Sequence, residues 1–132
     1  MSPIHQRYLN DTVGTASPGR LLVMLYDRLS LDLERAAAAM REHNREAAST
    51  ALVHAQDILL ELRCSLRLDQ WDGAQQLADL YSFLIAELMR ANTKQDADVV
   101  TECLRVVEPL RDAWREAVDS QQPTAMVGRA TA

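Results

Sequence analysis

An apolar stripe near the start of the chain limits the folds that this sequence can adopt. Ser17 and Pro18 form a helix start signal, because serine favours the N-cap and proline costs no hydrogen bond at the first helical position. Apolar residues then recur at steps of three and four, namely Leu22, Leu25, Leu29, Leu33, Ala36 and Met40. This spacing keeps one face of a helix apolar, so it predicts a helix over residues 18–41 that packs against a core.

Each of the first two predicted helices also carries apolar residues outside its core stripe. In the first helix these are Met24 and Leu31, seven residues apart. The second helix, predicted over 45–68, has a core stripe of Ala48, Leu52, Ala55, Leu59, Leu62 and Leu66, and a second stripe of Val53, Leu60 and Cys64 that Asp57 interrupts. The second stripes indicate either a docking surface or contacts with a neighbouring helix in a less regular bundle.

Two further helices are predicted over 73–91 and 97–119, and short loops force sequential helices to run antiparallel. The expected fold is all-α, an antiparallel up-down four-helix bundle over 15–119, with an N-terminal arm over 1–14 and a flexible tail over 120–132. Ile4, Tyr8 and Leu9 of the arm are expected to dock on the bundle. There they serve either as a simple tether or as a cap over the exposed apolar surface.

Composition and motifs exclude several classes of function. The net charge of −5 disfavours nucleic acid as a partner, and no apolar run approaches the roughly 18–20 residues that span a bilayer. The first ten residues have no apolar core and do not resemble a signal peptide, so we expect a cytoplasmic protein. No histidine follows a glutamate in the Glu-x-x-His pattern, and no phosphate loop or nucleophile elbow occurs. We therefore expect no enzyme activity, catalytic residue, metal or cofactor.

Six short fragments of the chain, in order, resemble one protein family. They are Tyr8 with Thr15-Ala16-Ser17-Pro18, Met24-Leu25-Tyr26-Asp27, Ala55-Gln56-Asp57-Ile58 with Glu61-Leu62 and Ser65-Leu66, Leu80-Tyr81, Ala91-Asn92, and Leu110-Arg111-Asp112-Ala113-Trp114. Together they cover about residues 8–118 and resemble the flagellin-specific export chaperones of bacterial flagella, the FliS type. The chain departs from the family pattern at Asp72-Gly73, where paired glycines are common, and at Pro109.

The resemblance implies a cytosolic chaperone that binds the disordered C-terminal segment of flagellin. Such a chaperone prevents premature polymerisation and delivers its client to the flagellar type III export apparatus through an export gate component. We expect the client to contact the second stripes, and the arm to cover them in the free protein. The expected partner-binding residues are Tyr8, Met24, Tyr26, Leu31, Val53, Gln56, Asp57, Leu60 and Cys64. A monomer or weak homodimer is expected; the alternative is a structural or signalling bundle that self-associates.

Overall fold

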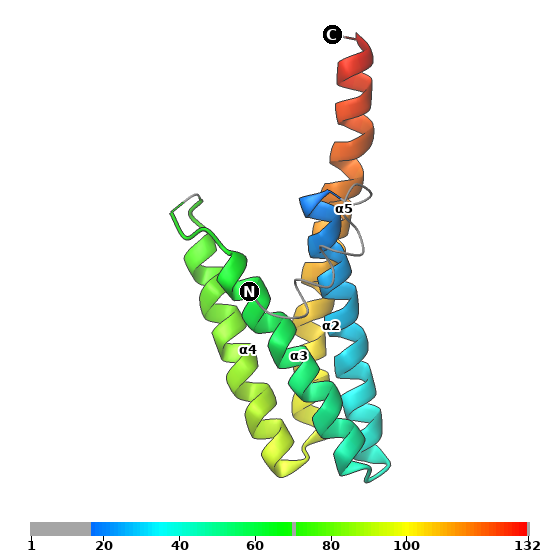
Figure 1. Cartoon of the computed structure of the whole chain (residues 1–132), viewed down its shortest axis with the longest axis vertical. Helices are drawn as coiled ribbons and strands as arrows, with labels where there is room; N and C mark the ends of the chain where they lie inside the picture. The colour runs from blue at the N-terminus through cyan, green and yellow to red at the C-terminus, as the bar shows by residue number, and fades with distance from the viewer. Residues whose placement is uncertain (1–16, 70, 132) are drawn as a thin grey trace.

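The computed structural model describes residues 17–69 and 71–131, with side chains described to residue 120. These residues form four helices in the order α2 (Pro18–Arg41), α3 (Arg45–Ser65), α4 (Ala74–Lys94) and α5 (Ala97–Thr131). Each helix packs against the next, and α5 closes the arrangement by packing along α2 (Figure 1). The predicted antiparallel four-helix bundle is confirmed.

Helix α2 has the ends that its sequence predicts. The Ser17 side chain accepts a hydrogen bond from the backbone N–H of Arg20 at 3.2 Å, and Pro18 occupies the first turn. The core stripe of α2 is buried at Leu25, Leu29 and every later position, whereas Leu22 at its start is only partly buried. The helix therefore becomes less enclosed toward its N-terminus.

Helices α3 and α4 end at other residues than the sequence indicates. α3 ends at Ser65 instead of 68, because Leu66 adopts an extended conformation with φ −70° and ψ 137°. α4 spans Ala74–Lys94 instead of 73–91. Gln95 takes up the left-handed conformation that ends α4, and its backbone N–H bonds to the carbonyls of Ala91 and Asn92.

Helix α5 is longer than expected. Its backbone is helical to Thr131, whereas the predicted helix ends at 119 and is followed by a tail. Pro109 lies inside this one helix on its exposed side, where water can satisfy the carbonyl that loses its partner. An Asp27–Arg115 ion pair links α2 to α5. The helix therefore continues through most of the segment expected to be a tail, and the flexibility of residues 120–132 stays a prediction.

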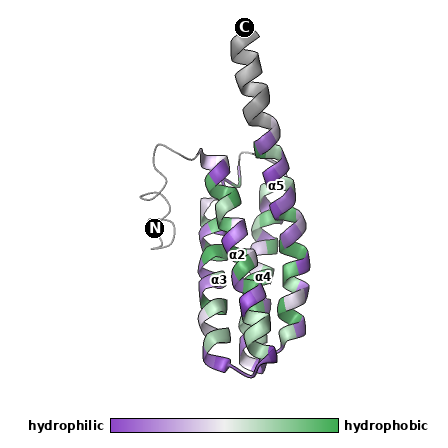
Figure 2. Ribbon diagram, turned by 90° about the vertical axis from the view of Figure 1, so that its right-hand side faces the viewer, coloured by the Kyte–Doolittle hydropathy of each residue, from purple (hydrophilic) through white to green (hydrophobic). Residues whose placement is uncertain are grey.

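The core lies between all four helices, and its largest fully buried side chains include Tyr26, Tyr81, Leu29, Leu59 and Leu88. Hydrophilic residues interrupt the hydrophobic ones along each helix (Figure 2). Within the described part of the chain, no helix is both long and apolar enough to cross a membrane.

Candidate functional site

The second stripe of α3 lies on the outer face of the bundle. Val53 is 52% exposed and Leu60 is 51% exposed. Asp57, which lies between them, and Cys64, one turn after Leu60, are also exposed. Their spacing of four, three and four residues places them on one side of the helix. We call Val53, Asp57, Leu60 and Cys64 the α3 surface. Gln56, beside it, is half-buried.

The other predicted site residues have different positions. Met24 and Leu31 are half-buried, so α2 presents no fully open apolar stripe. Tyr26, expected among the partner-binding residues, is buried instead, and its side chain is 0% exposed. Ile4, Tyr8 and Leu9 lie outside the described residues.

Tyr26 is buried because its hydroxyl group finds a partner inside the bundle. The hydroxyl oxygens of Tyr26 and Tyr81 are 2.5 Å apart and share a hydrogen bond between α2 and α4. Burial raises the pKa of both phenols, so both stay neutral at physiological pH. The partly buried Trp114 of α5 packs against the same core.

Exposed apolar side chains continue from α3 onto α4. Ser49 donates to Asn92 at 2.8 Å, and Arg63 donates to Ser82 at 2.7 Å. These two bonds fix the antiparallel register of α3 and α4, which places Val53 level with Met89. Met89 is 56% exposed, so an apolar side chain lies on each side of this helix boundary.

Sequence reasoning missed Met89 and also Phe83, which is 56% exposed. The sequence pattern could have indicated both residues, because each is apolar but falls outside the α4 core stripe of Leu77, Tyr81, Leu84 and Leu88. Their exposure extends the unpartnered apolar surface beyond the residues expected.

A second apolar feature lies at the end of the bundle where α2 begins and α3 ends. There the α3–α4 pair diverges from the α2–α5 pair (Figure 1). A cavity of about 430 Å³, which we call the end cavity, opens between them. It is lined by Pro18, Leu21, Leu22, Leu25, Leu62, Ser65, Leu66, Leu77, Tyr81, Trp71 and Trp114.

The end cavity also lay beyond the sequence prediction. Most of its lining belongs to core stripes, such as Leu22, Leu62 and Leu77, and a stripe does not show where helices diverge. The half-exposed Trp71 lies over Gly73, where a Cβ atom would overlap the indole ring. Gly73 therefore allows a tryptophan to form one wall of the cavity.

The two cysteines should differ sharply in reactivity. Cys64 is exposed on the α3 surface, whereas Cys103 is buried in the core, where desolvation raises the pKa of its thiol to about 11. Because the thiolate is the nucleophile, iodoacetamide at pH 8 should modify Cys64 quickly and Cys103 only in denaturant. Mass spectrometry of peptides after timed quenching checks this. Equal rates in the folded protein would contradict the burial of Cys103.

No candidate metal centre occurs in the part of the chain that the structure describes. Groups of three or more His, Cys, Asp or Glu side chains that could hold a metal ion are absent from the described residues. The described features are instead an exposed apolar surface and an apolar cavity on a helical bundle. Features of this kind are typical of proteins that dock apolar segments of other chains.

Comparison with known proteins identifies the family. The sequence model described as "Flagellar protein FliS" matches residues 1–122, and the chain belongs to this family. It is 30% identical over 115 residues to the "Flagellar secretion chaperone FliS" of Bacillus subtilis (strain 168), covering 87% of this chain and 86% of that one. It is 31% identical over 112 residues to the chaperone of the same name from Escherichia coli (strain K12), covering 83% and 82%.

A solved structure gives the same fold. The "Crystal structure of flagellar chaperone from bacteria" superposes with a TM-score of 0.72 at 19% identity, over 89% of this chain and 96% of that chain. The relatives are named as chaperones, which are not a class of enzyme. These names favour the chaperone reading over a self-associating structural or signalling bundle.

Proposed function

We propose that this protein is a cytosolic export chaperone that binds the disordered C-terminal segment of flagellin. Binding keeps the client from polymerising and delivers it to a component of the flagellar type III export gate. The observation that carries the proposal is the exposed apolar surface of α3 in a member of the FliS family. No catalytic step or cofactor takes part, because the chaperone acts by covering the client.

The geometry suits a client that folds on binding. A segment that forms amphipathic helices in a filament must bury an apolar stripe, and a chaperone offers a substitute surface for it. The α3 surface can take one helical face, and the end cavity can take a bulky side chain at the top of the bundle. The cost of ordering the client keeps the complex reversible despite a large contact area.

The proposed contacts centre on the α3 surface. Val53 and Leu60 supply apolar area, while Asp57 and Gln56 can bond to polar groups of the client. The half-buried residues Met24 and Leu31 and the exposed thiol of Cys64 contribute at the margins, and Tyr8 joins them from the arm.

In the free protein, we propose that the arm caps the apolar surfaces through Ile4, Tyr8 and Leu9. Pro18 lines the end cavity, so the segment before it joins the bundle at the rim of that cavity. This covalent attachment gives the arm a high local concentration at the cavity. Client binding then requires the arm to move aside.

Calorimetric titration tests the proposed function. A flagellin C-terminal peptide of about 40–60 residues should bind 1:1 with a negative heat-capacity change, the signature of apolar burial coupled to folding. A scrambled peptide of the same composition is the control. Absence of binding by a folded, monodisperse sample would reject flagellin as the client.

Sedimentation of the same sample should show a monomer or weak homodimer, and a tight oligomer would support self-association.

A further inference from the structure

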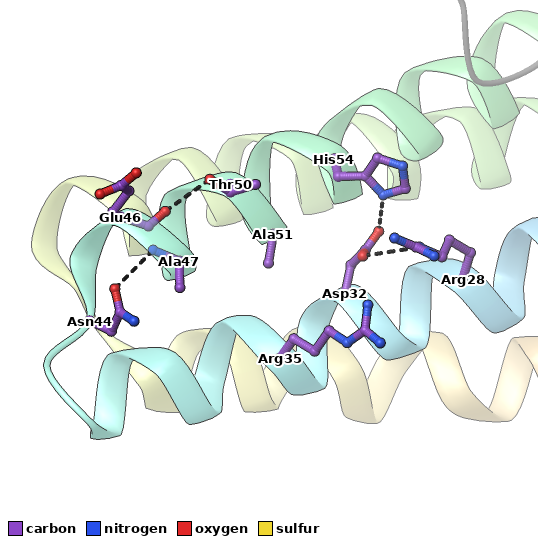
Figure 3. A pocket seen from close by; sticks show the side chains of 9 residues that line it. All are labelled: Arg28, Asp32, Arg35, Asn44, Glu46, Ala47, Thr50, Ala51 and His54. Carbon is purple, nitrogen blue, oxygen red and sulfur yellow. Dashed lines mark hydrogen bonds and ion pairs between the residues drawn. The ribbon is translucent and has the colours of Figure 1, made fainter.

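A polar groove between α2 and α3 is not used by the proposed chaperone function. It encloses about 690 Å³, within the range of cavities that bind ligands. Figure 3 shows its lining side chains, which come from α2, from α3 and from Asn44 at the start of α3. They are Arg28, Asp32, Arg35, Asn44, Glu46, Ala47, Thr50, Ala51 and His54.

The two walls of this α2–α3 groove differ in size and charge. The α3 wall has the small side chains Ala47 and Ala51, which leave space in front of α2. The α2 wall has the long side chains Arg28 and Arg35, and in Figure 3 the guanidinium group of Arg28 lies beside the Asp32 carboxylate. The space therefore faces a cationic wall.

Asp32 organises this wall from a buried position. Its side chain is only 3% exposed, and its two carboxylate oxygens are both engaged. Arg28 Nε donates to Oδ1 at 3.3 Å, and His54 Nδ1 pairs with Oδ2. The Asp32 carboxylate is thus engaged by Arg28 and His54, and the positive charge of Arg35 on the same wall has no acidic partner among the described residues. Glu46 adds the second negative charge of the lining from the α3 side.

Several donors of the α2–α3 groove have no acceptor within the described part of the chain. Arg35 forms no ion pair or hydrogen bond there, and Arg28 uses only Nε. Asn44 accepts from the N–H of Ala47 through Oδ1, so its amide NH₂ remains available. The other acidic lining residue, Glu46, directs its carboxylate away from Arg35 in Figure 3.

We propose that the α2–α3 groove binds an acidic segment of a second protein partner through glutamate side chains. Guanidinium groups bind carboxylates with paired, charge-assisted hydrogen bonds. The methyl groups of Ala47 and Ala51 can contact the methylene groups of such side chains. A single small anion would leave most of the 690 Å³ unfilled, whereas an extended acidic segment fills it.

This second site is separate from the proposed flagellin surface. The lining residues Ala47, Ala51 and His54 are on the side of α3 that faces α2, and His54 contacts α2 through Asp32. Val53 and Leu60 point to the outer face. The protein can therefore hold its client and an acidic partner at once.

NMR titration of the full chain with acetyl-tetraglutamate amide tests the proposal. Saturable shift changes should appear at amides lining the α2–α3 groove, and acetyl-tetraglutamine amide should produce none. Arg35→Gln should weaken tetraglutamate binding by at least about tenfold, because a charge-assisted pair is lost. Since Arg35 is exposed and unpaired within the described residues, this variant should melt at the unchanged temperature.

Arg41→Gln is the matched control, because Arg41 is on the same helix but bonds to Thr101 of α5 at 3.0 Å. It should bind tetraglutamate as the unaltered protein does. Equal weakening in both variants would reduce the effect to general charge attraction and overturn the proposal, as would absence of saturable binding. Displacement of tetraglutamate by the flagellin peptide would show one shared site and overturn the proposal of a second site. If the protein binds tetraglutamate but not the flagellin peptide, the proposed chaperone function is rejected and the proposed acidic site is retained.

Discussion

Leu59→Ala should lower the free energy of unfolding by about 2–5 kcal/mol, the range for truncating a fully buried leucine. Leu59 is 0% exposed and lies in the α3 core stripe between Ala55 and Leu62, which are also buried. The substitution removes apolar contacts and leaves a cavity that surrounding helices can only partly fill. Urea denaturation followed by circular dichroism measures the change.

Leu60→Ala is the control for Leu59→Ala, because it makes the same chemical change at the adjacent residue. Leu60 is half-exposed, so its truncation should change the free energy of unfolding by less than about 1 kcal/mol. Two similar losses would mean that α3 is buried on both sides, and the α3 surface would then be part of the core.

The contrast between these neighbours shows what a sequence can predict here. Leu59 and Leu60 are identical in type and differ only in phase along the helix, and the period of 3.6 residues assigns one to the core and the other to the surface. The same periodicity predicts the four helices, and the short loops between them predict their antiparallel order. Within the described residues, the structure agrees at both leucines.

Tyr26 shows where periodicity is insufficient. Its position in the helical repeat lies beside the core stripe of α2, and at such a position the polar hydroxyl group favours exposure to solvent. The phenol is buried because Tyr81 of α4, 55 residues away, supplies a hydrogen-bond partner. A partner that distant in sequence depends on the packing of the helices, which no local pattern contains.

The two cavities depend on packing in the same way. The end cavity exists because the helix pairs diverge, although its residues carry an ordinary core pattern. The α2–α3 groove exists because Ala47 and Ala51 face Arg28 and Arg35 across the boundary between two helices. The spacing of apolar residues within one helix predicts the side of the helix on which each residue lies. It does not predict the distance to the neighbouring helix.

Leu60→Asp should weaken binding of the flagellin peptide by at least about tenfold. Burying a leucine side chain stabilises a complex by about 1.5–3 kcal/mol, and an aspartate would lose this and place an unpaired charge against apolar surface. Because Leu60 is half-exposed in the free protein, the free energy of unfolding should change by less than about 1 kcal/mol. Part of that change comes from repulsion by Asp57 one turn away.

The control for this charge is Ala117→Asp, which introduces an aspartate at an exposed residue of α5, away from the α3 surface. Calorimetry should find flagellin affinity unchanged in this variant, because it adds the same charge away from the α3 surface. A large loss of stability in Leu60→Asp would assign Leu60 to the core instead. If Leu60→Asp is stable and binds the peptide with unaltered affinity, the client does not use the α3 surface. Binding would then have to rest on the end cavity, whose lining comes from all four helices.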